Sequence, residues 1–552
     1  MSEGIRLTVL GAGQSIGKSC FLLSVNGIHI LLDCGCYVGK DTKKGLPDFT
    51  KLPKGVTVKD ITVVLISHFH MDHIGGLVYL TEQLKYKGDI LASGPTRAIL
   101  PLLLKNNRSL ISSQMQMQTT VTMELFANLV KRIKEVAVRQ TVQINDRLRV
   151  TAHIAGHVLG AVMWEVQIDD RTILYTGDYS EDGTKFIPSY QLPQHFLLPN
   201  RLDMLIMECT YGNTDFKSFK TRQTELVHIV IETIRKRGKV LIPCYAIGFT
   251  QEVIVLIQQA LLQEGMKAPI YCSSSDSLSV LPMYQFFSTW VSGTLSSKSE
   301  TIQQFRTDFL DSPNPFILFA SSATMTTGVS RTAFERFASN PLNTVIFLGQ
   351  NSPESFIGQM LKEGAKLNGE TPVLCNRVVI PFSAHPDRKT NIRLIERSHP
   401  QSVVLIHGDK NNCAGFIKYY LTSHKESPLL LMPENGRTVQ YIPEAQRVRM
   451  SLKQAVHVRR EGEKRLCIEQ MLRCENGRAY LEDGVAVPLW NAVTLPCTTE
   501  KAKEIMSQLE AKQDTVHVQY EDGVIRITWL EGYQHEATAL ITMIFRVCKQ
   551  TQ

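Results

Sequence analysis

Four side chains of types that commonly bind metal ions lie within six consecutive positions of the sequence. The stretch ISHFHMDHIGG, residues 66–76, contains His68, His70, Asp72 and His73. If the chain is extended here, His68 and His70 point the same way. Asp72 and His73 then fall in the following turn, so one loop could offer ligands to two adjacent ions. Nitrogen and carboxylate ligands favour zinc, with manganese or iron as alternatives.

Two later segments each place one more possible ligand at the end of a predicted strand. His157 lies in AGHVLG and Asp178 lies in YTGDYS. Either residue alone is weak support, because a histidine after a strand is more often structural and a Gly-Asp pair is often only a turn. Together they complete the ligand count for two ions. The expected assignment has three ligands on one ion, two on the other and one bridging carboxylate: His68, His70 and His157; Asp72 and His73; and Asp178.

The elements that must position these side chains are short β-rich runs in the first third of the chain. Each run ends in glycine or in polar residues: IRLTVLGAG, HILLDCG, DITVVLISHFH, RLRVTAHIAGHVLG and RTILYTGDYS. Buried strands supply a rigid base, and the loops that follow them carry reactive groups. The pattern predicts that the chemistry lies along one edge of a sheet.

From about residue 209, predicted helices alternate with predicted strands. The helices TELVHIVIETIRKRG and QEVIVLIQQALLQEG flank the strand KVLIPC, and further strands are PIYCSS, PFILFASSA, TVIFLGQ and SVVLIHG. This alternation is typical of a parallel α/β sheet. After about residue 446, a hairpin around Asp522-Gly523 and the helix-like HEATALITMIFRV predict a small third α/β domain.

Length and composition indicate a multidomain globular protein. The 552 residues exceed what one hydrophobic core supports, and 43% hydrophobic with 20% charged residues leaves no room for a largely disordered chain. The net charge of +8 permits a polyanionic partner without requiring one. Twelve cysteines without a C-x-x-C pair predict a reducing compartment. We see no signal peptide and no apolar run of ~18 residues, so we expect a soluble intracellular protein with no membrane contact.

Four of these segments resemble motifs one to four of the metallo-β-lactamase fold. They are LDCG, SHFHMDH, AGHVLGA and YTGDYS, in the order and at intervals that suit the family. The resemblance implies an αββα sandwich. Asp33, in LDCG, resembles the motif-one aspartate, which in that family orients ligands from outside the ligand shell.

Three further segments resemble motifs A, B and C of the β-CASP nucleases. LIMECTYG contains Glu208, PFSAHPD contains His385 and LIHGDK contains His407. The resemblance implies that His407 is the remaining ligand of the second ion, that His385 is the acid for the leaving 3′ oxygen, and that Glu208 is its partner. Asp72 counts as a catalytic residue as well as a ligand.

The resemblance also implies a division into domains. A β-CASP α/β domain, residues 209–380, would interrupt a metallo-β-lactamase domain formed by residues 1–208 and 381–445. Residues 446–552 would form a C-terminal dimerisation domain.

Over residues 1 to about 440 the chain resembles the pre-mRNA 3′-end-processing endonucleases. The stretches IRLTVLGAGQSIGKSC, LPDFTKL and QTVQINDRLRVTAHIAGHVLGAVMW favour the Integrator branch, and the cleavage-and-polyadenylation branch is the alternative. The resemblance implies a two-zinc endonuclease acting on nascent RNA or pre-mRNA, and His407 favours RNA because the DNA-repair branch usually lacks that histidine. It also implies a heterodimer, through the C-terminal domain, with a catalytically inactive paralogue. The pair would belong to a larger RNA-processing complex in the nucleus, and an additional cytoplasmic location is left open.

Two segments depart from the family pattern. Phe249, in AIGFTQE, stands where the family often has an arginine, and GQNSPES replaces a GYCxxGT-like segment. A lost arginine removes a possible phosphate contact, so the RNA path or an autoinhibited state could differ. The hydroxyl-rich segment SSATMTTG, residues 321–328, could line that path or be an ordinary loop.

Two rival functions remain open at this point. A hydrolase of the same fold could act on a small ester or thioester, since fold alone does not name a reaction. The insertion and the two later histidines disfavour it. A non-catalytic scaffold is the second rival, and the filled motif positions disfavour that.

Overall fold

The computed structural model describes residues 4–38, 45–115, 121–184, 186–198, 201–292, 302–349 and 352–442, together with strands between residues 458 and 530. The chain forms two compact units, Met1–Glu444 and Ala445–Gln552.

Two seven-stranded sheets form the first part of the larger unit. The first sheet has the order β22-β1-β2-β3-β4-β5-β6. Its strands are β1 (Ile5–Gly11), β2 (Cys20–Val25), β3 (Ile28–Leu32), β4 (Ile61–Leu65), β5 (Asp89–Ser93), β6 (Ile133–Val136) and β22 (Thr438–Tyr441). The second sheet has the order β21-β20-β11-β10-β9-β8-β7. Its strands are β7 (Thr141–Asn145), β8 (Leu148–Ile154), β9 (Val162–Ile168), β10 (Arg171–Tyr175), β11 (Met204–Glu208), β20 (Ser402–Ile406) and β21 (Leu429–Leu431).

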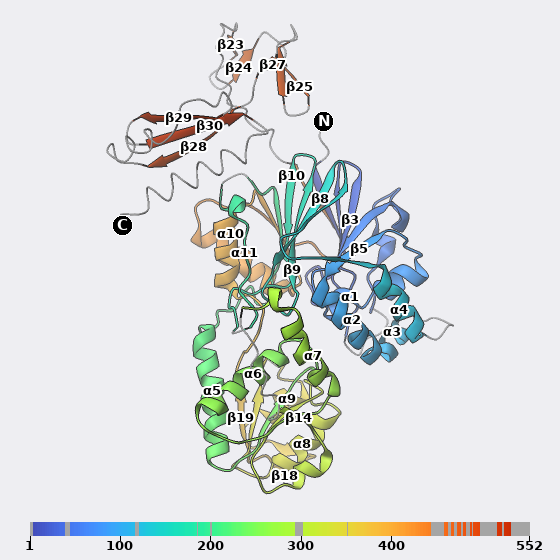
Figure 1. The fold of residues 1–552 in the computed structure, drawn as a ribbon, viewed down its shortest axis with the longest axis vertical. Coiled ribbons are helices and arrows are strands. Elements are labelled where there is room, and N and C mark those ends of the chain that lie inside the picture. The colour runs from blue at the N-terminus through green and yellow to red at the C-terminus, as the bar shows by residue number, and fades with distance from the viewer. Residues whose placement is uncertain are drawn as a thin grey trace. The chain divides into compact units, whose positions relative to one another are not determined.

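The two sheets pack face to face with helices outside them (Figure 1). Phe21 of the first sheet and Trp164 of the second belong to one buried cluster, which fills the space between the sheets. Helices α2 (Gly94–Asn106), α3 (Arg108–Met115) and α4 (Met123–Arg132) lie beside the first sheet, and α10 (Arg388–Ser398) and α11 (Lys410–Ser423) lie beside the second. The predicted αββα sandwich is therefore observed. No helix in the described part of the chain combines the length and apolarity needed to cross a membrane.

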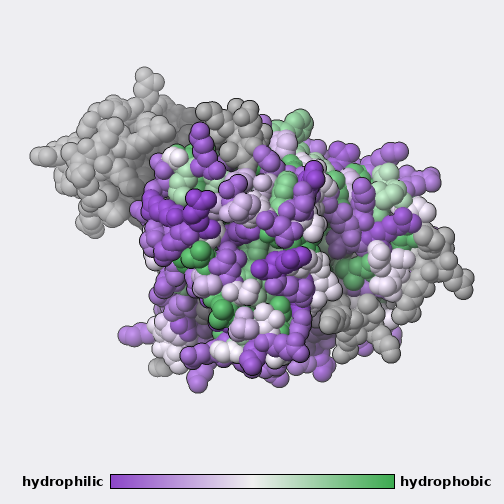
Figure 2. All heavy atoms as spheres, turned by 90° about the horizontal axis from the view of Figure 1, so that it is seen from below, coloured by the Kyte–Doolittle hydropathy of each residue, from purple (hydrophilic) through white to green (hydrophobic). Residues whose placement is uncertain are grey.

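Between β11 and β20 the chain builds a third, six-stranded sheet. Its order is β14-β13-β15-β12-β16-β19, and every neighbouring pair is parallel. The strands are β12 (Val240–Pro243), β13 (Ile270–Cys272), β14 (Ile302–Gln304), β15 (Ile317–Ala320), β16 (Thr344–Phe347) and β19 (Asn376–Val379). Parallel neighbours need crossover connections. Here these include α6 (Thr250–Gln263), α7 (Ser275–Phe286) and α8 (Val329–Phe337), whereas α5 (Phe219–Arg235) precedes β12, the first strand of this sheet. Both helices predicted in this region, TELVHIVIETIRKRG and QEVIVLIQQALLQEG, are present as α5 and α6. Figure 2 shows that this end of the molecule is mainly hydrophilic, with apolar residues in scattered patches.

The insertion leaves and re-enters the sandwich at adjacent strands. β11 pairs with β20 in parallel, with Glu208 opposite Ile406, and β10 pairs with β11 in parallel. The loops that follow β10, β11 and β20 therefore leave the second sheet at the same edge. Residues far apart in the sequence meet there.

The described part of the smaller unit consists of short antiparallel strands. The predicted hairpin is β29 (Val516–Glu521) and β30 (Val524–Leu530), with Glu521 opposite Val524. The other strands are β23 (Val458–Glu461), β24 (Arg465–Ile468), β25 (Leu472–Glu475), β26 (Arg478–Leu481), β27 (Ala486–Val487) and β28 (Trp490–Pro496). The predicted helix HEATALITMIFRV lies outside the described residues.

Candidate metal centre

The histidine-rich stretch follows a buried strand and enters a short helix. β4 ends at Leu65, and α1 (Met71–Ile74) begins after His70. Backbone bonds hold α1 against the segment after β3, because the Cys34 N–H donates to the His73 carbonyl at 2.9 Å. Asp72 and His73 therefore lie on a short helix whose backbone is fixed by hydrogen bonds to a neighbouring segment.

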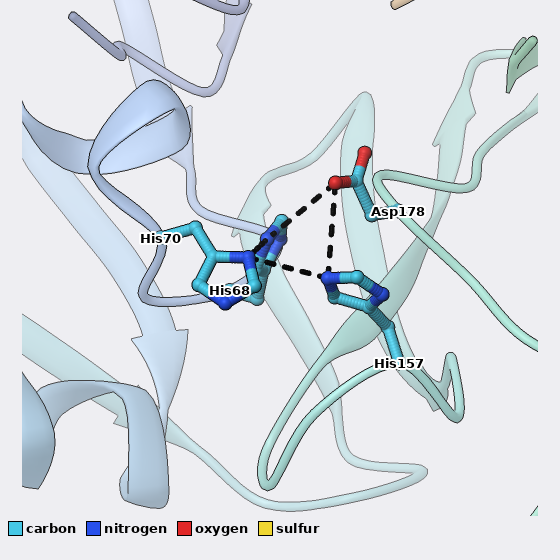
Figure 3. A group of neighbouring side chains, drawn as sticks. All are labelled: His68, His70, His157 and Asp178. Atoms are coloured by element: carbon cyan, nitrogen blue, oxygen red, sulfur yellow. Dashed lines mark hydrogen bonds and ion pairs between the residues drawn. The ribbon is translucent and has the colours of Figure 1, made fainter. Parts of the chain in front are cut away.

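Three imidazoles and one carboxylate converge at the end of β4 (Figure 3). His68 Nε2 lies 3.0 Å and His157 Nε2 lies 3.2 Å from His70 Nδ1. Asp178 Oδ2 lies 3.8 Å from the Nε2 atoms of both His68 and His157. One atom from each of the four residues lies within 4.8 Å of the others. The sequence predicts His68, His70 and His157 on one ion with Asp178 bridging, and the structure brings these four residues together.

The protonation chemistry of this group suits a cation. The His157 Nδ1–H donates to the Ala384 carbonyl at 2.8 Å, so in the neutral ring the Nε2 lone pair faces the other donors. Burial lowers the pKa of His68 and His157, and it lowers the pKa of His70 to about 4. Neutral imidazole is the form that binds metal.

The Asp178 carboxylate also lacks a full set of partners. Its side chain is 2% exposed, and Oδ1 has no hydrogen-bond partner in the described part of the chain. Burial would raise its pKa, but His407 and His73 hold that pKa well below the ordinary value. A buried, ionised and incompletely bonded carboxylate is costly unless a cation pairs with it. The residues present therefore fit a bound divalent metal.

A second group of donors lies on the other side of Asp178. His407 Nε2 is 3.1 Å from Asp72 Oδ2, and His407 Nδ1 is 3.4 Å from Asp178 Oδ1. His73 Nε2 lies 3.4 Å from Asp178 Oδ2 and 3.9 Å from Asp72 Oδ2. Asp72, His73 and His407 could hold one ion together. This is the set expected for the second ion.

Asp33 fixes the orientation of the His73 ring through the Nδ1 nitrogen. Its Oδ2 accepts from His73 Nδ1 at 2.7 Å, from the Ser67 hydroxyl at 2.7 Å and from the Tyr175 hydroxyl at 2.5 Å. Its Oδ1 accepts from the Ser67 N–H at 2.7 Å. With Nδ1 occupied, His73 directs Nε2 toward Asp178. This is the geometry expected of a residue that orients a ligand without being one.

His385 and Glu208 form a pair beside the donor groups. His385 Nδ1 lies 2.9 Å from each Glu208 oxygen and 3.7 Å from Asp178 Oδ2. Burial would lower the pKa of His385, but Glu208 and then Asp178 raise it to about 9. The His385 side chain is 21% exposed, whereas Glu208 is fully buried. Because Nδ1 donates to Glu208, Nε2 is the nitrogen left for another group.

The insertion also reaches the centre, although no sequence motif indicates this contact. A Cβ atom on Gly248 would lie 3.1 Å from His70 Nε2. The Gly248 N–H donates to Gln251 Oε1 at 3.0 Å, so the loop is anchored to α6. The sequence signal of this loop is the AIGFTQE motif, in which this glycine precedes Phe249. Tyr175, which bonds to Asp33, was also missed although it lies in the YTGD segment.

Of the three segments that depart from the family or could line an RNA path, AIGFTQE and SSATMTTG have contacts of their own. The centroid of the Phe249 ring lies 6.4 Å from that of Phe219 and 5.5 Å from that of Phe382, so Phe249 belongs to an aromatic cluster. In SSATMTTG, the Ser322 hydroxyl bonds within its own loop, to the Thr327 carbonyl at 3.1 Å. Gln350 and Asn351 of GQNSPES lie outside the described residues.

Three domain families match successive parts of the chain. A metallo-beta-lactamase superfamily domain matches residues 22–200, a Beta-Casp domain residues 250–361, and a Zn-dependent metallo-hydrolase RNA specificity domain residues 370–427. Integrator complex subunit 11 of Danio rerio is 32% identical, over 79% of this chain and 74% of its own length. The chain belongs to the metallo-β-lactamase/Beta-Casp nuclease family. The resemblance in the motifs and the fold inferred from it are thereby confirmed.

Other members of this nuclease family have related names. Cleavage and polyadenylation specificity factor subunit 3-II of Arabidopsis thaliana is 34% identical, over 78% of this chain and 72% of its own. Endoribonuclease ysh1 of Schizosaccharomyces pombe is 28% identical, over 84% of this chain and 62% of its own length. A crystallised protein of unknown function from Enterococcus faecalis V583 shares the fold, with a TM-score of 0.52 at 15% identity over 79% of this chain and all of that one.

Proposed function

We propose that the chain is a metal-dependent RNA endonuclease that hydrolyses phosphodiester bonds of nascent RNA or pre-mRNA, most like Integrator complex subunit 11. The observation that carries this proposal is the convergence of two donor groups on Asp178 beside the Glu208–His385 pair. The Beta-Casp match and the relative named an endoribonuclease favour RNA over a small ester.

The proposed ligands are His68, His70 and His157 for one ion and Asp72, His73 and His407 for the other, with Asp178 between them. Bound there, two divalent cations would act as Lewis acids toward a phosphodiester and its attacking water. We propose Zn²⁺, because imidazole and carboxylate ligands suit it and because one matching domain is described as Zn-dependent. Asp33 keeps His73 in the orientation that this arrangement needs.

His385 is the proposed general acid. Glu208 fixes its Nδ1–H, so Nε2 can present a proton to the leaving 3′ oxygen. The partial exposure of His385 lets it meet a substrate, while the buried Glu208 carboxylate holds the ring. Gly248 leaves room beside His70 that a larger side chain would fill.

The proposed partners come from the names of the relatives. One relative is named as a subunit of the Integrator complex, and another as a subunit of the cleavage and polyadenylation specificity factor. We propose that this chain works in a nuclear RNA-processing complex and that the unit Ala445–Gln552 pairs with a catalytically inactive paralogue.

One contrast between two variants tests the site. In the full chain purified with its partners, Asp178→Asn should reduce bound metal to well under two ions per chain and abolish RNA cleavage, because even loss of a residue that only orients a ligand lowers metal affinity by roughly 10–100-fold. His385→Ala should retain both ions and lose cleavage by roughly 100-fold or more. The measurements are elemental analysis and single-turnover cleavage.

The matched control is Asp170→Asn, which changes an exposed aspartate in the turn between β9 and β10. Full cleavage by Asp178→Asn would refute the ligand assignment. Loss of metal from His385→Ala would show that this histidine is a ligand and not the acid.

A further inference from the structure

A polar trough lies on the outer face of the second sheet, apart from the donor groups. It is a cavity of about 390 Å³ over β7, β8 and β9, with one wall from the segment before β11. We call it the β7–β9 trough. Its floor is the outer face of these strands, with Arg149, Thr151, His153 and Glu165, and Arg139 and His195 also line it.

Strand alternation explains why the floor is polar. Val150 and Ala152 of β8 and Val166 of β9 are buried in the cluster between the sheets. The alternate residues on β8 and β9 must then point to the outer face. Pairing places Thr151 opposite both Thr141 and Glu165, so the polar side chains form rows across three strands.

The one carboxylate among the residues that line the trough already accepts hydrogen bonds from three neighbours. Glu165 is 3% exposed, and it accepts hydrogen bonds from His153 Nε2 at 2.8 Å, His195 Nε2 at 3.0 Å and Gln167 Nε2 at 2.7 Å. Burial would raise the pKa of Glu165, but the bonds from His153 and His195 lower it to about 2. The carboxylate therefore has few lone pairs left for a ligand.

The two arginines of the trough have only neutral partners. Arg139 Nη2 donates to Gln191 Oε1 at 2.8 Å, and Arg149 Nε donates to Gln167 Oε1. Within the described ranges, neither guanidinium forms an ion pair with a carboxylate. Arg147, on the same hairpin, instead pairs with Asp169 at 2.8 Å. Guanidinium groups with unused donors suit phosphate, because their planar fork matches its oxygens.

We propose that the β7–β9 trough is a second RNA-binding site, which takes a phosphate group of the RNA backbone through Arg139 and Arg149. The proposal rests on the proposed function, because it takes RNA to be the substrate. His153, which lines the trough, lies four residues before His157. An extended chain spans at most ~3.6 Å per residue, so the backbones at these positions are within roughly 14 Å. An RNA held at the trough would therefore be held near the metal centre.

Binding of a fluorescent single-stranded RNA to the full chain tests the proposal. Measurements use a His385→Ala background, so that RNA is not cut, at about 50 and 200 mM salt. The double variant Arg139→Gln/Arg149→Gln should weaken binding by about tenfold at low salt and lower the slope of log K against log salt by about 1 to 2. Arg147→Gln is the matched control and should change affinity by less than about twofold, because Asp169 already neutralises that arginine. Arg149→Lys keeps the positive charge and loses the planar guanidinium. Its RNA affinity should lie between those of the double variant and the Arg147→Gln control.

Double-variant binding that equals the Arg147→Gln control would overturn the proposal. A parallel arm measures thermal stabilisation by inorganic phosphate. A phosphate effect that the double variant loses, with RNA affinity unchanged, would overturn the RNA assignment and give the trough to free phosphate. Binding is measured without turnover. A natural chain that never cuts RNA would therefore refute the proposed function, while the binding test of the trough would still give its answer.

Discussion

Asp178 is the residue on which the proposed centre depends most. Its carboxylate lies 3.4 to 3.8 Å from a ring nitrogen of each of five histidines: His68, His73, His157, His385 and His407. A bridging carboxylate needs this central position, because it must reach both ions at once. No other residue in the described donor groups has so many imidazole neighbours.

Glu252 is a second buried carboxylate, in the insertion and outside the proposed site. It lies on α6 at 4% exposure. The Thr184 hydroxyl donates to Oε2, and Oε1 has no hydrogen-bond partner in the described ranges. Burial raises the pKa of Glu252 from 4.5 to about 7. The folded protein therefore holds this proton more tightly than the unfolded chain does.

This raised pKa gives a pH-dependent prediction. As pH rises from about 4.5 to 7, the unfolded chain loses the proton first, so Glu252 lowers the free energy of unfolding, by up to about 3 kcal/mol above pH 7. Glu252→Gln has no ionisable carboxyl at this position, so the variant does not show this decrease in the free energy of unfolding. The unfolding free energy of the variant relative to the natural chain should rise between about pH 5 and 7 and level off above it, as measured by denaturant unfolding.

Glu264→Gln is the matched control, because Glu264 is an exposed carboxylate at the end of the same helix. The same pH trend in both variants would show that burial of Glu252 is not the cause.

At the scale of elements, the proposed centre depends on how α1 is braced. Gly35 follows β3 and lies directly against α1, and a Cβ atom there would be 1.7 Å from the Asp72 carbonyl oxygen. The Cys36 N–H donates to the Met71 carbonyl at 2.9 Å. The segment after β3 therefore fixes the position of α1 and of the proposed ligands that α1 carries.

Gly35→Ala should displace α1 and damage the second ion's site. We expect metal affinity to fall by roughly tenfold or more, because ligand orientation is lost. Titration with zinc, together with circular dichroism to confirm folding, measures this. Gly349→Ala is the control, since a Cβ there meets nothing within 4 Å. Equal zinc affinity in the two variants would contradict the bracing role of Gly35.

Local patterns predicted the elements that the motifs occupy, but not every element. The strands ending at Leu65, Ile154 and Tyr175 and the helices α5 and α6 were all expected from periodicity and stop signals. Residues 94–132, which form α2, α3 and α4, carried no prediction. Pro101 inside α2 is one reason, because proline is a local signal against helix interior.

At the scale of the whole molecule, the larger unit contains every residue proposed for the metal centre. Met1–Glu444 is compact by itself and has its own hydrophobic clusters. A chain shortened to residues 1–444 should therefore keep two ions per chain. It should lose its partner, because the proposed pairing surface lies in Ala445–Gln552.

Metal analysis and affinity purification of tagged full-length and shortened chains check both outcomes. A shortened chain that still retains the partner would disprove the pairing role of the smaller unit. A shortened chain that folds but lacks metal would disprove the independence of the larger one.

The sequence by itself determined the ligand types and the fold family. In SHFHMDH the donors are neighbours in the chain, so their spacing alone indicates a metal site. Tertiary structure decided which distant residues join them. β10, β11 and β20 lie side by side in parallel, and this alone brings Asp178, Glu208 and His407 to one edge. The β7–β9 trough had no sequence signal, because His195 comes from a segment far from the β7–β8 hairpin that carries Arg149, and the two meet only in the folded chain.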